Sequence, residues 1–171
     1  GIDLGGSHIG IGLLNNDNEL LEKVEKNRKE SFESEAEISQ LIESYIDKFV
    51  SENSIELIGI ATPGNVKENK MQNLFNLGIS KLDFTPLIAK YPDIRFLIQN
   101  DSKAAAKAEL RYGALREDKD SVFLCLGTGI GSAVFMNRRL LQANKNTGFE
   151  LGHMIIEKDG KLCHCGKRGC F

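Results

Sequence analysis

Residues 1–14 read GIDLGGSHIGIGLL, and the prediction of the fold starts from the pattern in this segment. Its pattern is an apolar strand, the turn Gly5-Gly6-Ser7, and a second apolar strand over Ile9–Leu14. Glycines allow backbone N–H groups to approach an anion closely, and a neighbouring acid, here Asp3, can hold a divalent metal. An ordinary hairpin is the competing interpretation of a single turn of this kind.

The same pattern returns in the second half of the chain. Val122–Leu126 predicts a strand, Gly127-Thr128-Gly129-Ile130-Gly131 a turn, and Ser132–Met136 another strand. Neither glycine turn opens a helix, so neither is a dinucleotide-binding or P-loop motif. The repetition predicts two lobes of similar design, residues 1–117 and 118–171, whose turns could clamp a polyphosphate between them.

Between the two turns, strands and helices are expected to alternate. Apolar residues from Ile38 to Val50 recur at helical spacing, and Ser34 with Glu37 forms a capping box before them. The remaining expected elements are strands over Leu20–Val24, Ile55–Ala61 and Ile94–Ile98, a helix over Phe84–Tyr91 capped by Thr85, a helix over Ser102–Leu115, and an irregular segment over Met71–Leu82. This order predicts an α/β fold with a largely parallel sheet covered by helices.

Asn100-Asp101 falls where a buried strand meets a helix. The carboxyl ends of parallel strands face the usual ligand crevice of such sheets. A carboxylate there could accept the proton of a substrate hydroxyl during attack on phosphorus. Asp101 could equally serve as the N-cap of the following helix.

The end of the chain concentrates metal-binding side chains. Cys163, Cys165 and Cys170 follow His153 closely, and thiolate with imidazole is the ligand set of a tetrahedral zinc site. His164 competes with His153 for the fourth position, but it lies between two ligands. The remaining cysteine, Cys125, is expected to be buried in its apolar strand.

Glu150 precedes His153 by three residues, so both side chains would point the same way if the segment were helical. The carboxylate could hydrogen-bond a substrate, and a metal beside it could hold it still. The competing interpretation is a surface glutamate beside a partly buried histidine.

Composition narrows the classes of protein. The chain has 171 residues, of which 41% are hydrophobic and 27% charged, and its net charge of −2 favours neither a nucleic-acid nor a membrane surface. We expect reduced thiols and a cytoplasmic location, because four cysteines occur without a visible secretion signal. We also expect the natural protein to extend in both directions.

Together these motifs resemble the ROK family, whose members have the actin-like, hexokinase-like ATPase (ribonuclease H-like) fold. The resemblance covers the chain from Asp3-Leu4-Gly5-Gly6-Ser7 to Cys170, and its most specific part is Gly148-x-Glu150-x-Gly152-His153 with Cys163-x-Cys165-Gly166-x-x-Gly169-Cys170. The chain would hold the first lobe and the beginning of the second. It departs from the family at Ser7, where Thr is usual, and at Gln99, where Glu is common.

The resemblance implies a role for each of these residues. Asp101 would be the general base. The sugar pocket would be lined by Gly64, Asn65, Asn76, Asn100, Asp101, Glu150 and His153. Mg²⁺ and the phosphates of ATP would be surrounded by Asp3, Gly5, Gly6, Ser7, Gly127, Thr128 and Gly129. A structural Zn²⁺ would be held by His153, Cys163, Cys165 and Cys170, and it would fix Glu150 and His153 against the sugar.

The implied activity is ATP-dependent phosphorylation of a hexose or N-acetylhexosamine, in a protein that forms a homodimer or larger homo-oligomer. The alternative is a sugar-responsive transcriptional repressor of the same family, whose DNA-binding segment would precede residue 1. The family usually carries a further sugar-binding Glu just after the last cysteine, where this chain ends at Phe171.

Overall fold

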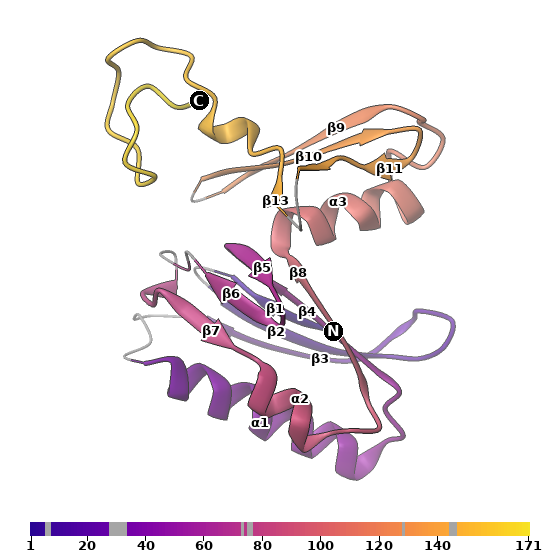
Figure 1. Ribbon diagram of the computed structural model, residues 1–171. Coiled ribbons are helices and arrows are strands. Elements are labelled where there is room, and N and C mark those ends of the chain that lie inside the picture. Colours follow the sequence, from indigo (N-terminus) through magenta and orange to yellow (C-terminus); the bar gives the residue numbers. More distant parts are fainter. Residues whose placement is uncertain (6–7, 28–33, 73, 75–76, 128, 144–146) are drawn as a thin grey trace. The chain divides into compact units, whose positions relative to one another are not determined.

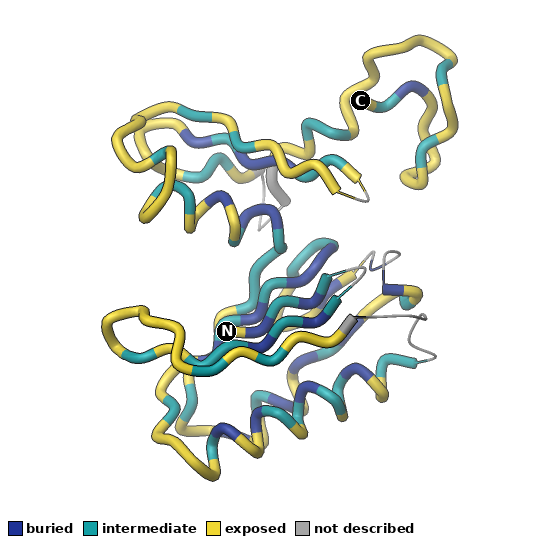
Figure 2. Tube along the Cα trace, turned by 180° about the vertical axis from the view of Figure 1, so that it is seen from behind, coloured by how far each residue is buried: buried dark blue, intermediate teal, exposed yellow. Residues whose placement is uncertain are grey.

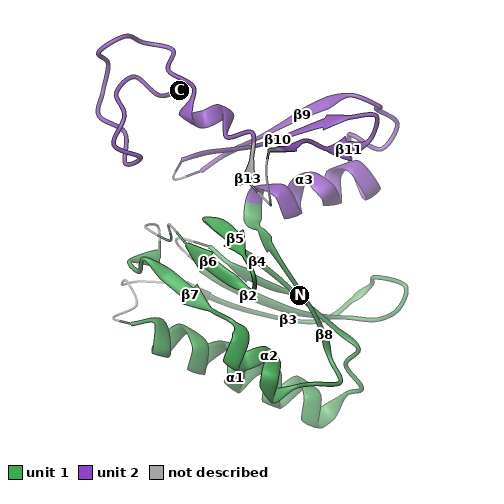
Figure 3. Cartoon of the chain, in the orientation of Figure 1, with its two compact units in different colours: residues 1–101 green, residues 102–171 purple. Residues whose placement is uncertain are grey.

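The computed structural model describes residues 1–171 except 6–7, 28–33, 73, 75–76, 128 and 144–146. The described chain forms two compact units, Gly1–Asp101 and Ser102–Phe171, which divide at the start of one helix (Figure 3). The predicted lobes, 1–117 and 118–171, remain a prediction about the whole protein.

Unit 1 is built on a five-stranded sheet with the order β3-β2-β1-β4-β8. Its strands are β1 (Ile2–Leu4), β2 (His8–Leu14), β3 (Leu20–Asn27), β4 (Leu57–Thr62) and β8 (Arg95–Asn100). The first three form an antiparallel meander, whereas β1, β4 and β8 run parallel. The sheet is therefore mixed, and the expectation of a largely parallel sheet was wrong for its β2–β3 side.

The helices α1 (Glu35–Glu52) and α2 (Thr85–Lys90) lie together on one face of this sheet (Figure 1). Helix α1 buries Ile38, Ile42, Ile46 and Phe49, at the spacing that the sequence shows. Burial of each such side chain contributes about 1.5–3 kcal/mol relative to exposure. The Ser34 Oγ accepts a hydrogen bond from the Glu37 backbone N–H at 3.3 Å, which confirms the predicted N-cap.

Two local predictions in unit 1 were wrong. The segment expected to be irregular contributes β6 (Lys70–Gln72) and β7 (Lys81–Asp83), which form a small antiparallel sheet with β5 (Asn65–Lys67). Strands of three residues carry too little alternation to be recognised from sequence. Thr85 is the first residue of α2 and not its cap: the N-cap is Phe84, whose side chain cannot accept a hydrogen bond, and the Asp83 carboxylate accepts from the Thr85 N–H at 2.9 Å.

Unit 2 contains α3 (Asp101–Tyr112), which begins with the last residue of unit 1, and a three-stranded sheet with the order β11-β10-β9. Its strands are β9 (Ser121–Leu126), β10 (Ile130–Met136) and β11 (Arg139–Leu140), followed by the short pair β12 (Gln142–Ala143) and β13 (Thr147–Gly148) and the 3₁₀ helix η2 (Leu151–His153). Ala106, Ala133 and Phe135 form a small buried core. Residues 154–171 follow as an extended, mostly exposed loop (Figure 2).

The burial predicted for Cys125 was wrong, because this cysteine is exposed. The core of unit 2 includes Phe123 of β9, but Cys125 lies further along this edge strand, near the glycine turn. Across the described residues, no helix has the length and apolar character needed to cross a membrane.

Candidate functional site

The parallel strands of unit 1 bring three predicted motifs to one edge of the sheet. In the strand register Asp3 is the partner of Ala61, Ala61 of Gln99, and Thr62 of Asn100. The carboxyl ends of β1, β4 and β8 therefore lie side by side, and each is followed by a predicted functional segment. Neighbouring strands are about 4.8 Å apart, so the Asp3 and Gln99 positions are separated by roughly 10 Å across the sheet.

The first of these segments is the turn between β1 and β2. The Gly5 N–H donates to the His8 carbonyl at 2.9 Å, which closes the turn. The Asp3 carboxylate lies 3.1 Å from Nε2 of His8, and both side chains are partly exposed. Sequence reasoning did not single out His8, because the family resemblance assigns it no role. Gly6 and Ser7 lie outside the described residues.

The second segment is the turn that links β4 to β5. Gly64 has a φ of +87° there, and a Cβ on it would lie 2.2 Å from the Gln72 carbonyl oxygen, so only glycine fits. The Asn100 amide donates to the Gly64 carbonyl at 3.1 Å and ties this turn to the end of β8. Asn65 begins β5. Asn76, predicted to belong to the same pocket, lies outside the described residues.

Asp101, the third of these segments, is the first residue of α3 and is half-buried. A carboxylate at a helix N-terminus interacts favourably with the helix dipole. This position agrees with both interpretations of Asp101, as a helix-terminal residue and as a base at the carboxyl edge of the sheet.

The second glycine turn joins β9 to β10 in unit 2. The Gly127 N–H donates to the Gly129 carbonyl at 2.9 Å, and both glycines are exposed. Among the described residues, no atom lies within 4 Å of a Cβ built at either position. The backbone of this turn is therefore accessible to an anionic ligand. Thr128 lies outside the described residues.

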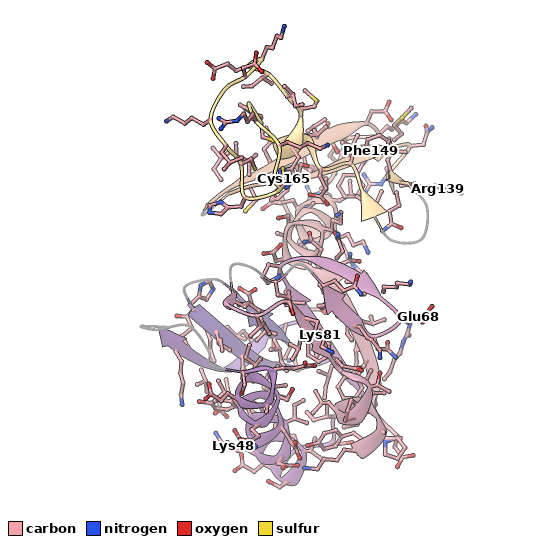
Figure 4. All side chains as sticks on the ribbon, turned by 60° about the vertical axis from the view of Figure 1, so that its left-hand side comes forward. Lys48, Glu68, Lys81, Arg139, Phe149 and Cys165 are labelled. Carbon is pink, nitrogen blue, oxygen red and sulfur yellow. The ribbon has the colours of Figure 1, made fainter. Side chains whose placement is uncertain are left out.

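The four predicted zinc ligands come together in unit 2. The Nδ1 or Nε2 of His153 and the Sγ atoms of Cys163, Cys165 and Cys170 lie within 4.8 Å of one another. His153 belongs to η2, and Cys165 lies on the loop that follows it (Figure 4). Among the described residues, His164 is not part of this cluster. The structure thus favours His153 over its competitor.

The distances fit a tetrahedral ion. Zinc bonds of about 2.3 Å to sulfur and about 2.0 Å to nitrogen imply S–S and S–N separations of roughly 3.8 and 3.6 Å. Cys165 Sγ lies 3.6 Å from Cys170 Sγ, and Cys163 Sγ lies 3.6 Å from His153 Nδ1. All four cysteines of the chain are free thiols.

Protonation of these thiols differs with their surroundings. The backbone N–H of Lys167 lowers the pKa of Cys165, whereas desolvation raises the pKa of Cys170 to about 11. Zinc binds thiolates, so metal binding must displace protons from this cluster.

The loop that carries the cysteines has almost no apolar core. Met154, Ile155, Ile156, Leu162 and Phe171 are all exposed. Its order comes from backbone contacts such as Cys163 N–H to the Lys167 carbonyl at 2.8 Å and Ile156 N–H to the Gly169 carbonyl at 2.8 Å. A bound metal would supply the cross-link that hydrophobic burial does not.

Two glycines of this loop give a matched test of its packing. Gly166 and Gly169 both have positive φ, +86° and +76°. A Cβ on Gly169 would lie 1.6 Å from the Glu157 carbonyl oxygen, whereas among the described residues nothing lies within 4 Å of one on Gly166. We expect Gly169→Ala to lower zinc content and loop protection in hydrogen exchange strongly. Gly166→Ala should carry only backbone strain, about 1 kcal/mol. Equal behaviour of the two variants would contradict this packing.

Glu150 has a partner that sequence analysis missed. Its Oε1 accepts from the Nζ of Lys103 at 2.6 Å, and Lys103 is only 1% exposed. His153 instead directs Nδ1 toward Cys163. Glu150 precedes η2, a single 3₁₀ turn that ends at His153, and each of the two side chains has its own partner.

Comparison with known proteins identifies the family. The sequence profile of the ROK family matches residues 1–171, and the chain belongs to the ROK family. It is 32% identical to a glucokinase of Thermotoga maritima over 100% of the chain and 55% of the relative. It is 27% identical to an N-acetylmannosamine kinase of Yersinia pestis over 99% of the chain and 58% of the relative. The chain thus spans about half the length of the curated relatives it matches.

Solved structures show the same fold. A ROK family glucokinase from Streptomyces griseus, in complex with glucose and AMPPNP, superimposes with a TM-score of 0.80 at 26% identity, over 99% of this chain and 54% of that one. A ROK family transcriptional regulator, homologous to the Escherichia coli MLC protein, gives a TM-score of 0.79 at 25% identity, over 99% and 44%. The fold is the actin-like, hexokinase-like ATPase fold.

Proposed function

We propose that the whole protein transfers the γ-phosphoryl group of MgATP to a hydroxyl group of a hexose or N-acetylhexosamine. The observation that carries the proposal is the shared carboxyl edge of β1, β4 and β8, where Asp3, the Gly64 turn and Asp101 follow one another. A metal-binding acid and a base at one sheet edge suit phosphoryl transfer, and the similarity to sugar kinases supports this chemistry.

In this mechanism Asp101 accepts the proton of the attacking hydroxyl. The residues proposed to contact the sugar are Asn100, Gly64, Asn65, Asn76, Glu150 and His153. The backbone N–H groups of the two glycine turns bind the phosphates, together with Ser7 and Thr128. Mg²⁺, when bound through Asp3, supplies positive charge to the phosphate oxygens.

Zinc in this proposal is structural, because four protein ligands leave no open coordination position. It would hold His153 and order the loop over residues 154–171. We further propose that the whole protein works in the cytoplasm as a homodimer or larger homo-oligomer.

The test is a coupled ADP-release assay of the full-length protein against glucose, fructose, allose, N-acetylglucosamine and N-acetylmannosamine. We expect at least one sugar to give turnover that depends on Mg²⁺ and ATP. Omission of sugar is the control for background ATP hydrolysis. Absence of sugar-dependent ADP release with every sugar would contradict the proposal.

A transcriptional regulator is the second candidate, favoured by the likeness to the MLC homologue. A regulator needs sugar binding but no proton acceptor, so retention of Asp101 favours the kinase. A basic helix-turn-helix segment upstream in the full gene, together with sugar-sensitive DNA binding and no turnover, would favour the regulator.

A further inference from the structure

We propose that Lys103 is a positioning residue, which holds the carboxylate of Glu150 in the orientation that binds the sugar. This inference rests on the proposed function, in which Glu150 contacts the sugar. In this proposal, residues of α3 and β10 hold Glu150 in position, whereas the metal would hold His153.

The ion pair between Lys103 and Glu150 is buried on the lysine side. The Lys103 side chain is 2% exposed and the Glu150 side chain 39% exposed, with 2.6 Å between Nζ and Oε1. A buried ammonium group is costly unless a partner compensates its charge. Lys103 also lies in the first turn of α3, where the helix dipole disfavours a cation. The carboxylate of Glu150 offsets both costs, so the pair fixes one oxygen of Glu150.

The backbone around Glu150 is anchored as well. The buried Ser132 Oγ donates to the Phe149 carbonyl at 2.9 Å and accepts from the Leu151 N–H at 2.9 Å. One side chain of β10 thus bonds to the residues on both sides of Glu150. A Cβ on Gly152 would lie 2.2 Å from the Ile130 carbonyl oxygen, so η2 packs directly against the same strand.

These contacts leave part of Glu150 available to a ligand. Among the described residues, Oε1 is paired with Lys103 and Oε2 accepts no hydrogen bond. The side chain keeps more than a third of its surface exposed. A carboxylate held through one oxygen presents the other in a fixed direction, which lowers the entropic cost of binding a sugar hydroxyl.

None of these contacts involves a zinc ligand side chain. Lys103 and Ser132 come from α3 and β10, whereas the ligands of the metal come from η2 and the loop that follows it. A substitution that releases the metal should therefore disturb the position of His153 more than the orientation of Glu150. This separates the two supports experimentally.

The experiment measures KM for sugar, KM for ATP, kcat and zinc content in the full-length protein. Lys103→Met removes the charge but keeps the length of the chain. We expect it to raise KM for sugar at least ~10-fold, with KM for ATP within ~2-fold and zinc unchanged. Lys103→Arg retains the cation and should stay within ~3-fold of the native KM for sugar. Lys107→Met, one turn further along α3 and exposed, is the matched control and should leave every parameter unchanged.

A double-mutant cycle with Glu150→Gln identifies the partner. If Lys103 acts through Glu150, adding Lys103→Met to Glu150→Gln should change KM for sugar by less than ~2-fold. Should Lys103→Met not fold, Lys103→Gln carries the same test with an expected rise of ~3-fold or more.

Three results would overturn the inference. A native KM for sugar in Lys103→Met, with a raised one in Glu150→Gln, overturns the positioning role alone. Fully additive effects of Lys103→Met and Glu150→Gln on KM for sugar would also overturn the positioning role. A native KM for sugar in Glu150→Gln overturns the sugar contact itself, and with it this part of the proposed function.

Ser132→Ala tests the backbone anchor independently. We expect it to raise KM for sugar ~3-fold or more. Ser121→Ala is its matched control, because Ser121 is a serine of the neighbouring strand whose buried Oγ bonds to no described residue. Equal, unchanged KM values in the two variants would overturn the anchoring of Glu150 by β10.

Discussion

Asp101→Asn in the full-length protein is expected to lower kcat for hexose phosphorylation at least ~100-fold, the usual contribution of a positioned general base. Asparagine has nearly the same shape and is as good as aspartate at a helix N-terminus, so the start of α3 should persist. Sugar binding, measured by calorimetry, should largely survive. The substitution thus separates the chemical role of Asp101 from its role in starting the helix.

Asp93→Asn is a suitable control, because Asp93 is an exposed aspartate in the turn before β8. Its kcat should equal that of the native protein. Native turnover in Asp101→Asn would rule out the assignment of the base. Loss of both turnover and sugar binding, with a lowered melting temperature, would point to a structural role at the helix terminus.

Purified protein is expected to contain about one zinc per chain, and Cys165→Ser is expected to release it. Structural zinc contributes on the order of 10 kcal/mol of binding free energy in small zinc-dependent folds, and this loop has little else to order it. Metal content by elemental analysis and thiol titration give the readout. Release of zinc should also expose residues 154–171 to proteolysis.

Cys125→Ser is the matched control, since Cys125 is a free, exposed cysteine outside the cluster. It should keep zinc at the native level. A native protein without zinc and with freely reactive Cys163, Cys165 and Cys170 would refute the metal site.

Much of this molecule could be predicted from local sequence. The strands β1, β2 and β9, the helix α1 with its Ser34 cap, and the metal cluster all follow from patterns within about twenty residues. Such patterns are readable because apolar periodicity and short ligand spacing reflect the geometry of the local backbone. The assignments of Asp101 and of the sugar and phosphate contacts stay predictions.

The errors arose where the outcome depends on distant residues. Cys125 lies in an apolar strand, but its strand is at the edge of a small sheet. The small sheet of β5, β6 and β7 exists through pairing between segments that are each too short to show a pattern.

Spacing along the chain was sufficient to predict the family, the order of the glycine turns and the longer strands, and the three cysteines of the candidate metal site, because apolar periodicity and ligand spacing are local properties. Only the tertiary structure decided that Glu150 pairs with Lys103, 47 residues away, that Ser132 binds the backbone on both sides of it, and that His153 rather than His164 joins the cysteines. A lysine in the sequence of an alanine-rich helix is typical of a solvated face. It becomes a buried partner only in the tertiary structure, where α3 packs against β10 and the ammonium group of Lys103 is removed from water.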